Sequence, residues 1–269
     1  MMLNLVKYKD LLIRLAWKEI RVRYKEPLLG FLWALLAPFF MALILMLVFT
    51  KVIRVPVGNF PFFIFLVTGI FPWNFFSNVI SASVMSILEG GNLIKKVYFP
   101  REIIPLSIVL ANSINFLFTL LVVIVFLFIF GLKISPFIFL LPVAFMLQVF
   151  FMSGMALLVS GSQVLYRDIK FIVEIVMLLW FYVTPIFYPM ELILNISEFA
   201  FKLYSLNPFV GLISLYRISL LGNSYLESLP SGIDVVNIII YSAVFCIAVF
   251  FIGYNYFNKR ESVFADMVK

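Results

Sequence analysis

Histidine is absent from this 269-residue chain, cysteine occurs once, and charged residues make up only 12% of the sequence. Without histidine, the chain lacks the commonest neutral-pH proton carrier and the commonest transition-metal ligand. The single cysteine, Cys246, excludes a disulfide or a thiolate metal cluster within one chain. Soluble domains carry about 25% charged residues, whereas here 64% of residues are apolar. A water-soluble fold is therefore excluded.

Sites that convert energy are missing as well. No phosphate-binding loop of the form G-x-x-x-x-G-K-[ST] occurs, and the twelve glycines are scattered. Ion-coupled carriers usually hold carboxylates at mid-membrane. The one candidate, Glu174, lies close to Arg167, Asp168 and Lys170, where an interfacial carboxylate paired with bases is the simpler interpretation. Internal repeats, another mark of such carriers, are not apparent. We expect a partner to drive whatever this chain moves.

Long uncharged blocks predict an all-α membrane protein, because about 20 apolar residues in a helix cross a bilayer. Six transmembrane helices are expected, at residues 28–50, 60–88, 103–130, 136–159, 171–187 and 235–256. The second block contains Gly69, Pro72 and Asn74, so we expect a broken helix there that faces protein or a watery cavity. With residues 28–258 as the membrane domain, residues 1–27 form an N-terminal segment and residues 259–269 a tail.

Positive charge is distributed unevenly between the predicted loops. With the N-terminus inside, the outer segments hold only five of the 20 Lys and Arg residues, namely Lys51, Arg54, Lys133, Lys202 and Arg217. The positive-inside rule then places both termini in the cytoplasm. The net charge of +7 is explained as a topology signal and an affinity for anionic lipid, without nucleic acid.

Three segments outside the predicted spans carry further information. Before the first span, an amphipathic helix is predicted on the inner membrane surface, because one side carries basic residues at helical spacing and the other side apolar ones. The basic residues are Lys7, Arg14, Lys18, Arg21 and Lys25, and the apolar ones are Leu5, Leu12, Ala16 and Ile20. The inner loop 89–102 holds apolar residues in a water-facing turn, which indicates a contact with a partner protein or with the membrane surface. The outer stretch 189–232 predicts two short amphipathic helices that meet at Asn207-Pro208 in a re-entrant element.

Aromatic side chains are abundant, at 18% of the sequence with 33 phenylalanines. Most are expected to face lipid or to pack between helices. Those near helix breaks could instead stack on sugar rings in a channel, and we single out Trp33, Phe71, Trp73, Tyr182 and Tyr188.

Short motifs run in order through nearly the whole chain. They are Arg21-Val22-Arg23-Tyr24-Lys25-Glu26-Pro27 with Leu28 to Trp33, Gly69-Ile70-Phe71-Pro72-Trp73, Asn92-Leu93-Ile94-Lys95-Lys96, Phe99-Pro100-Arg101-Glu102-Ile103, Tyr166-Arg167-Asp168, Tyr182 to Pro189, Asn207-Pro208, Tyr216-Arg217 and Glu261-Ser262-Val263-Phe264-Ala265-Asp266. With six spans, this set resembles the membrane subunit of type 2 ABC exporters. Within them it resembles the permeases that export O-antigen, capsule and teichoic acid polysaccharides across the cytoplasmic membrane of bacteria.

The resemblance implies a homodimer that binds two copies of a separate ATPase, with ATP and Mg²⁺ held by the ATPase and no cofactor or metal bound by this chain. It implies that residues 1–27 are an interface helix and that residues 91–100 are a coupling helix on the ATPase. The implied coupling residues are Leu93, Ile94, Lys95, Lys96, Tyr98, Phe99, Arg21 and Lys25. The cargo would be a polysaccharide on undecaprenyl diphosphate, guided by Arg14, Arg21, Arg23 and Lys25 because guanidinium groups pair with phosphate oxygens. Asn207, Pro208, Tyr216 and Arg217 would belong to the outer gate.

Three alternatives remain open. The nearest is a type 2 ABC permease for another amphipathic cargo, such as a drug or a lipid. A second is an intramembrane enzyme, for example a lipid-linked sugar transferase. It would need clustered acidic or histidine side chains, and only the surroundings of Asp168 and Glu174 come close. A third is a passive channel, which would work without a partner.

Overall fold

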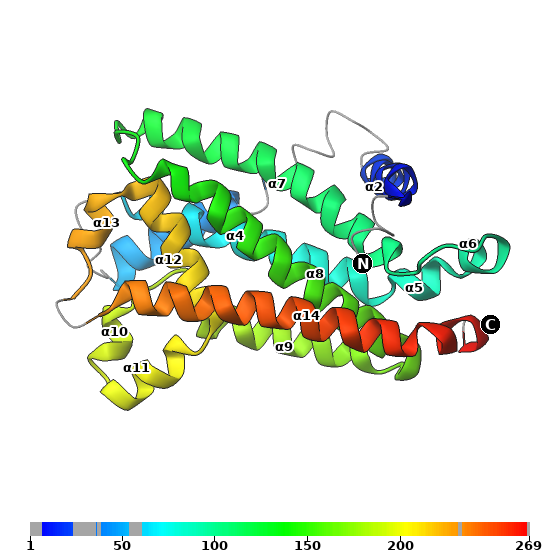
Figure 1. Ribbon diagram of the computed structural model, residues 1–269. Coiled ribbons are helices and arrows are strands. Elements are labelled where there is room, and N and C mark those ends of the chain that lie inside the picture. The colour runs from blue at the N-terminus through cyan, green and yellow to red at the C-terminus, as the bar shows by residue number, and fades with distance from the viewer. Residues whose placement is uncertain (1–6, 24–35, 37–38, 54–60, 231–232, 268–269) are drawn as a thin grey trace.

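Long helices lie side by side along one axis, and short helices cover both ends of the bundle (Figure 1). The computed structural model describes residues 7–23, 36, 39–53, 61–230 and 233–267. Within those ranges every regular element is helical. The elements are α2 (Lys9–Arg23), η1 (Val48–Ile53), α4 (Phe62–Val84), α5 (Ser86–Glu89), α6 (Gly91–Lys96), α7 (Ile103–Ile129), η2 (Ile138–Leu140), α8 (Leu141–Leu165), α9 (Ile169–Val183), α10 (Glu191–Leu194), α11 (Glu198–Ser205), α12 (Pro208–Leu221), α13 (Asn223–Glu227) and α14 (Val235–Met267).

Four helical segments of the described residues are long and apolar enough to cross a membrane: Phe62–Val84, Ile103–Ile129, Ile138–Leu165 and Val235–Glu261. They correspond to the second, third, fourth and sixth predicted spans. The fourth helix continues to Leu165, beyond the predicted end at residue 159, and the sixth continues to Met267, into the predicted tail.

The other two predicted spans stand differently. Much of the first, residues 28–50, lies outside the described residues, and the part that is described includes a helical stretch over residues 39–47. The fifth, residues 171–187, was predicted too long, because α9 ends at Val183 after only 15 residues. At 1.5 Å per residue such a helix is about 22 Å long, short of the roughly 30 Å hydrocarbon core. Pro185 accounts for the early end, since the residue before a proline disfavours the helical conformation.

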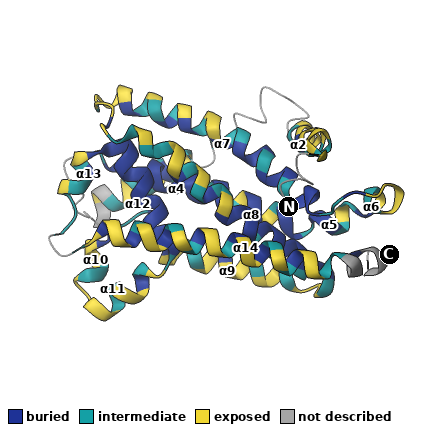
Figure 2. Cartoon of the chain, viewed as in Figure 1, coloured by how far each residue is buried: buried dark blue, intermediate teal, exposed yellow. Residues whose placement is uncertain are grey.

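Helix α4 is the central helix of the bundle (Figure 2). In the most apolar 18-residue stretch of α4, 83% of the residues are buried within this one chain, whereas in the corresponding stretch of α14 only 33% are. The predicted break at Pro72 was wrong, since α4 continues through this residue. Gln148 of α8 donates a hydrogen bond to the Pro72 carbonyl at 2.7 Å, and Thr68 Oγ1 donates to the Ile64 and Phe65 carbonyls. The expectation that this stretch faces protein is confirmed.

Helices α8 and α14 cross with almost no space between their backbones. A Cβ atom added to Gly253 would lie 2.1 Å from the Gly154 carbonyl oxygen, and one added to Gly154 would lie 2.5 Å from the Val249 carbonyl oxygen. Such close backbone approach is typical of small residues between membrane helices. A similar close approach joins α12 to α14, where a Cβ on Gly211 would meet Ser242. These contacts bring the backbone of α14 close to both neighbours.

Short helices α10 to α13 form one end of the bundle, here called the α11 end. Two helices meet at Asn207-Pro208, as predicted, but only α11 is amphipathic. Helix α12 is buried at every position, so the prediction of a second amphipathic helix was wrong. The opposite end, here called the α6 end, carries α2, α5, α6 and the C-terminal part of α14 (Figure 1).

Candidate functional site

The loop that follows α6 is the most prominent exposed apolar feature of the α6 end. Tyr98 is 94% exposed and Val97 is 53% exposed, next to the exposed amines of Lys95 and Lys96. Val97 is already extended, with φ −137° and ψ 135°, so the helix ends just before these side chains. Tyrosine is enriched at protein contact sites whereas lysine is depleted there, so Tyr98 is the residue of this tip that is typical of a protein contact.

Other predicted coupling residues point inward instead. Phe99 is buried in a small hydrophobic cluster, here called the end cluster, and Leu93 and Ile94 pack against it half-buried. The buried members of the end cluster are Ile87, Phe99, Ile103, Ile104, Leu157, Val164, Phe257 and Phe264. The six predicted coupling residues of this segment therefore divide into an exposed tip at Lys95, Lys96 and Tyr98 and an anchoring part at Leu93, Ile94 and Phe99.

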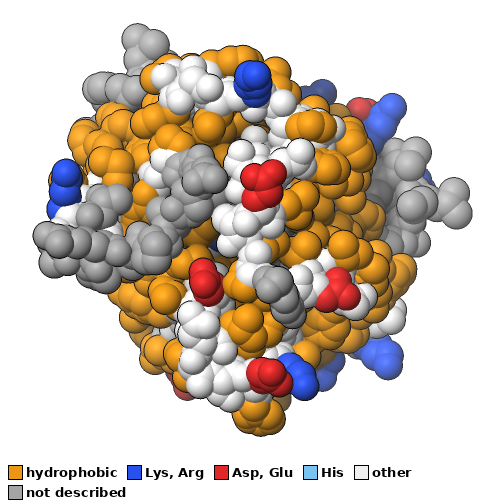
Figure 3. Space-filling view, turned by 90° about the vertical axis from the view of Figure 1, so that its left-hand side faces the viewer, with side chains coloured by type: hydrophobic (Ala, Val, Ile, Leu, Met, Phe, Trp, Pro, Cys, Tyr) orange, Lys and Arg blue, Asp and Glu red, His pale blue; other side chains and the backbone are white. Residues whose placement is uncertain are grey.

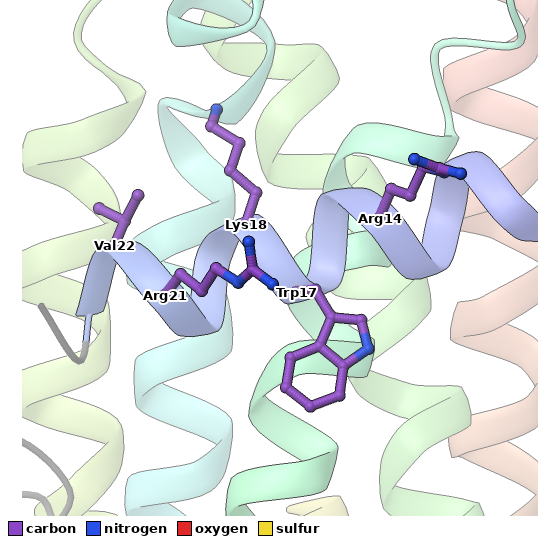
Figure 4. Close-up of a pocket in the computed structure, with 5 residues that line it drawn as sticks. All are labelled: Arg14, Trp17, Lys18, Arg21 and Val22. Carbon is purple, nitrogen blue, oxygen red and sulfur yellow. The ribbon is translucent and has the colours of Figure 1, made fainter. Parts of the chain in front are cut away.

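Helix α2 lies across the transmembrane helices on the same end (Figure 4). Leu11, Leu12 and Leu15 pack against the end cluster, and Ala16 is buried, as the predicted apolar face requires. Ile20, on the same predicted face, is half-buried. The helix therefore rests its apolar face on the start of α7 and keeps its basic face free.

An open cavity of about 720 Å³ runs along the free face of α2. It is lined by Arg14, Trp17, Lys18, Arg21 and Val22, and Figure 4 shows Trp17 and Lys18 pointing to opposite sides of the helix. Two of the predicted phosphate guides, Arg14 and Arg21, thus share one cavity. Arg23 is the last residue of α2, and Lys25 lies outside the described residues.

A second cavity of about 560 Å³ adjoins α2 on its other side. Lys18 lines both cavities, and Glu19 and Lys170 line only the second. Its remaining walls come from Leu15, from residues 81–93 and from the first turns of α7. Trp17 and Lys18 were not predicted as site residues, although their positions three and four residues after Arg14 could have indicated them.

The predicted channel aromatics fall into two groups. Phe71 and Trp73 are buried in the main core, and Trp73 packs edge-on against Phe209 at 5.1 Å between ring centroids. Tyr182 is 59% exposed, and Tyr188 donates a hydrogen bond to the Tyr182 carbonyl at 3.1 Å. Trp33 lies outside the described residues. Among the described members of this set, the exposed Tyr182 and the half-buried Tyr188 present an aromatic surface, whereas Phe71 and Trp73 do not.

Asn207 joins three segments at the α11 end. Its side-chain oxygen accepts hydrogen bonds from the Phe209 amide at 3.0 Å and from Trp180 Nε1 at 2.9 Å. Its amide group donates to Thr184 Oγ1 at 3.1 Å. Asn207 is thus the N-cap of α12 and also ties that helix to the end of α9.

Arg217, on α12, is fully buried rather than exposed in an outer loop. Its Nη2 donates to the Phe65 carbonyl at 3.2 Å and to the Ile186 carbonyl at 3.0 Å, and its guanidinium lies 3.5 Å from the Phe65 ring centroid. Among the described residues, Nε has no hydrogen-bond partner. Tyr216, its neighbour, is also buried with an unpartnered hydroxyl, and Pro208 begins the helix. Arg217 was counted as a topology signal, which its burial contradicts, because that rule concerns charges in loops.

Charge differs between the two ends. The exposed or half-buried cations of α2, α6 and the 167–170 turn all lie at the α6 end. Figure 3, which views the molecule from the α11 end, shows a largely hydrophobic surface with acidic side chains and also several basic ones, so this end has no comparable excess of positive charge. Four apolar helices of spanning length, a basic amphipathic helix across them and this charge asymmetry define a multi-pass membrane protein.

Comparisons with known proteins extend this class to a family. The profile of the ABC-2 type transporter family matches residues 10–221. The chain is 32% identical over 266 residues to "O-antigen export system permease protein RfbA" of Klebsiella pneumoniae, covering 98% of this chain and 97% of the relative. It is 35% identical over 214 residues to the RfbA permease of Myxococcus xanthus, covering 80% and 81%. The "Polysialic acid transport protein KpsM" of Escherichia coli is 23% identical over 252 residues, covering 91% of each chain. This chain belongs to the ABC-2 type transporter family.

Proposed function

We propose that this chain is the permease subunit of an ABC exporter that moves a polysaccharide, carried on undecaprenyl diphosphate, across the bacterial cytoplasmic membrane. The family match, and relatives named for O-antigen export and polysialic acid transport, support this cargo class. A separate ATPase supplies the energy, in two copies against a homodimer of this chain. The α6 end faces the cytoplasm, in keeping with its positive charge.

The exposed tip of the α6 loop carries the proposal. Tyr98 is almost wholly exposed, and burying an aromatic side chain in a partner's groove removes a large apolar area from water. An aromatic tip exposed to water adds nothing to packing within the membrane, whereas it can bind in a groove of a docking ATPase. We therefore assign Tyr98, with Lys95 and Lys96 beside it, to contact with the ATPase.

Replacing Tyr98 by glutamate tests this assignment. We expect Tyr98→Glu to insert and fold normally, because the side chain makes little contact within the chain, and to lose ATPase binding and polymer export. A triple variant that also charged Leu93 and Ile94 would damage the end cluster, so the single variant is the cleaner one. Phe199→Glu is the matched control, since Phe199 is a 76% exposed aromatic at the other end. Normal export by Tyr98→Glu would reject the assignment.

The basic cavity of α2 suits the diphosphate of the lipid carrier. Arg14 and Arg21 supply guanidinium groups, and Trp17 supplies an aromatic side chain of the kind that settles at the membrane–water interface. We expect the double variant Arg14→Gln with Arg21→Gln to bind undecaprenyl diphosphate at least about ten-fold more weakly, as measured by tryptophan quenching in lipid nanodiscs. The double variant Lys133→Gln with Lys202→Gln removes two cations elsewhere and serves as control. Equal affinity of the wild type and the Arg14/Arg21 variant would refute this role.

The homodimer is supported by the free apolar face of α9. Ile175, Leu178, Leu179 and Tyr182 are all more than half exposed on that helix, and helix faces of this kind pack in membranes against another protein or lipid. In the dimer, Tyr182 and Tyr188 line the path of the sugar, and Asn207, Pro208, Tyr216 and Arg217 hold the outer gate. With serine in place of Cys246, a cysteine at position 178 or 179 should cross-link two copies. Failure of both positions would argue against this interface.

A further inference from the structure

The C-terminal part of α14 reaches the loop that follows α6. Helix α14 continues to Met267, beyond the apolar segment that ends at Glu261. Figure 1 shows this last part at the α6 end of the bundle, beside α5 and α6. The two segments are about 160 residues apart in sequence, so their meeting is a purely tertiary contact.

Polar contacts join them at Arg101 and Glu261. The Arg101 backbone N–H donates to Glu261 Oε1 at 2.8 Å, and Arg101 Nη1 donates to the Glu261 backbone carbonyl. One side of each pair carries a charge, and such hydrogen bonds are stronger than those between neutral groups. Arg101 follows Tyr98 by three residues, so the loop is tied immediately after its exposed tip.

Apolar contacts lie beneath the same loop. Phe264 is completely buried, and its ring centroid lies 5.0 Å from that of Phe257. Both rings pack over Gly161 of α8, where an added Cβ would be 3.4 Å from each. Phe264 and Phe99 belong to the same end cluster, so α14 supports the loop from inside while Glu261 holds it by its backbone.

We propose that Glu261 and Phe264 are positioning residues that brace the Tyr98 loop, so that a force on this loop is passed to α14. Helix α6 has six residues, too few to be stable by itself, so tertiary contacts must fix its orientation. Without the brace, a partner pushing on Tyr98 would bend the loop instead of moving the membrane helices. The functional part of this inference rests on the proposed coupling function, whereas the mechanical part does not.

Hydrogen exchange of the purified full-length chain in nanodiscs tests the mechanical part without any ATPase. In Glu261→Ala we expect the amides of residues 97–99 and of Arg101 to exchange about ten-fold faster, the effect of losing one charge-assisted hydrogen bond. Glu261→Gln keeps an acceptor oxygen and should restore much of the protection. Lys259→Ala removes an exposed charge from the same helix end and should change nothing. Unchanged exchange in Glu261→Ala overturns the brace.

Reconstitution with the ATPase tests the functional part. We expect Glu261→Ala and Phe264→Leu to bind the ATPase and to let it hydrolyse ATP, but to export several-fold less polymer per ATP hydrolysed. Equal loss of ATP hydrolysis and polymer export would indicate ordinary folding damage and overturn the inference. Faster hydrogen exchange together with an unchanged ratio of export to hydrolysis would also overturn it. If Tyr98→Glu also leaves ATPase binding intact, the proposed function fails. The exchange result would still judge the brace by itself.

Discussion

Replacing Arg217 by methionine tests why a fully buried cation is present in α12. Among the described residues, no carboxylate pairs with its guanidinium, whose partners are two backbone carbonyls and the rings of Phe65 and Tyr225, the latter with its centroid 5.9 Å away. Burying an unpaired cation has a desolvation penalty of several kcal/mol. A charge-assisted hydrogen bond returns about 1.5–3 kcal/mol, and this guanidinium makes two to backbone carbonyls. The two contributions nearly cancel.

Methionine fills most of the same volume without a charge. We therefore expect Arg217→Met to change the free energy of unfolding by no more than about 2 kcal/mol in either direction. Arg217→Ala also leaves a cavity, and truncation of a large buried side chain to alanine lowers stability by about 3–5 kcal/mol. If the guanidinium serves the gate through its bonds to the Phe65 and Ile186 carbonyls, Arg217→Met should fold well and export poorly.

Thermal unfolding of the detergent-purified chain and polymer export in proteoliposomes measure the two effects separately. Lys202→Met, at an exposed position, is the control and should change neither. A loss of more than about 4 kcal/mol in Arg217→Met would refute the reasoning, because the guanidinium would then be a net stabilising group. Full export by a stable Arg217→Met variant would remove Arg217 from the gate.

Three other predictions concern stability. Gly253→Ala forces a Cβ against the Gly154 carbonyl and should lower the free energy of unfolding by about 1–3 kcal/mol. Gly161→Ala, the control, meets only ordinary contacts and should be neutral or gain up to about 1 kcal/mol from helix propensity. Equal effects of the two variants in chemical unfolding would contradict the crossing geometry. Burial, with a contribution from Glu261, raises the pKa of the Glu102 carboxyl above its ordinary 4.5. The folded protein therefore favours the protonated carboxyl and loses stability as the pH rises above 4.5. Glu102→Gln should raise the melting temperature at pH 7–8 but not below pH 4.5, and a shift that is the same at every pH would refute this. Asn207→Ala removes the α12 cap and leaves Trp180 Nε1 without its acceptor, so we expect the free energy of unfolding to fall by about 2–4 kcal/mol in the same assay. Asn207→Asp should lose less, and an unchanged stability of Asn207→Ala would show that these hydrogen bonds are dispensable.

Local patterns in the sequence predicted the features that depend on nearby residues. Hydropathy located the four long helices, and the spacing of Arg14, Lys18 and Arg21 predicted the free basic face of α2. The exposed tip at Tyr98 follows from the same kind of argument. Each of these depends on residues close together in the chain.

Features that depend on distant residues could not be predicted in this way. Helix α4 continues through Pro72, and the Pro72 carbonyl accepts a hydrogen bond from Gln148, which lies 76 residues further on. The burial of Arg217 depends on carbonyls of α4 and of the segment after α9, so a rule that counts charges in loops treats it as exposed. By sequence Phe99 belongs to an exposed apolar loop, whereas the structure buries it in the end cluster, whose other members come from α5, α7, α8 and α14. A single sequence shows the residue types at these contacts but not their pairing.

The glycine crossing gives α14 the geometry of a lever with unequal arms. At 1.5 Å per residue, the arm from Gly253 to Glu261 is about 12 Å long, and the arm from Gly253 to Ile238, which contacts α12, is about 22 Å. If α14 tilts rigidly about the crossing, a displacement of about 1 Å at Glu261 becomes one of about 2 Å in the opposite direction beside α12. In such a tilt, a small displacement at the α6 end of α14 becomes a larger one at the α11 end.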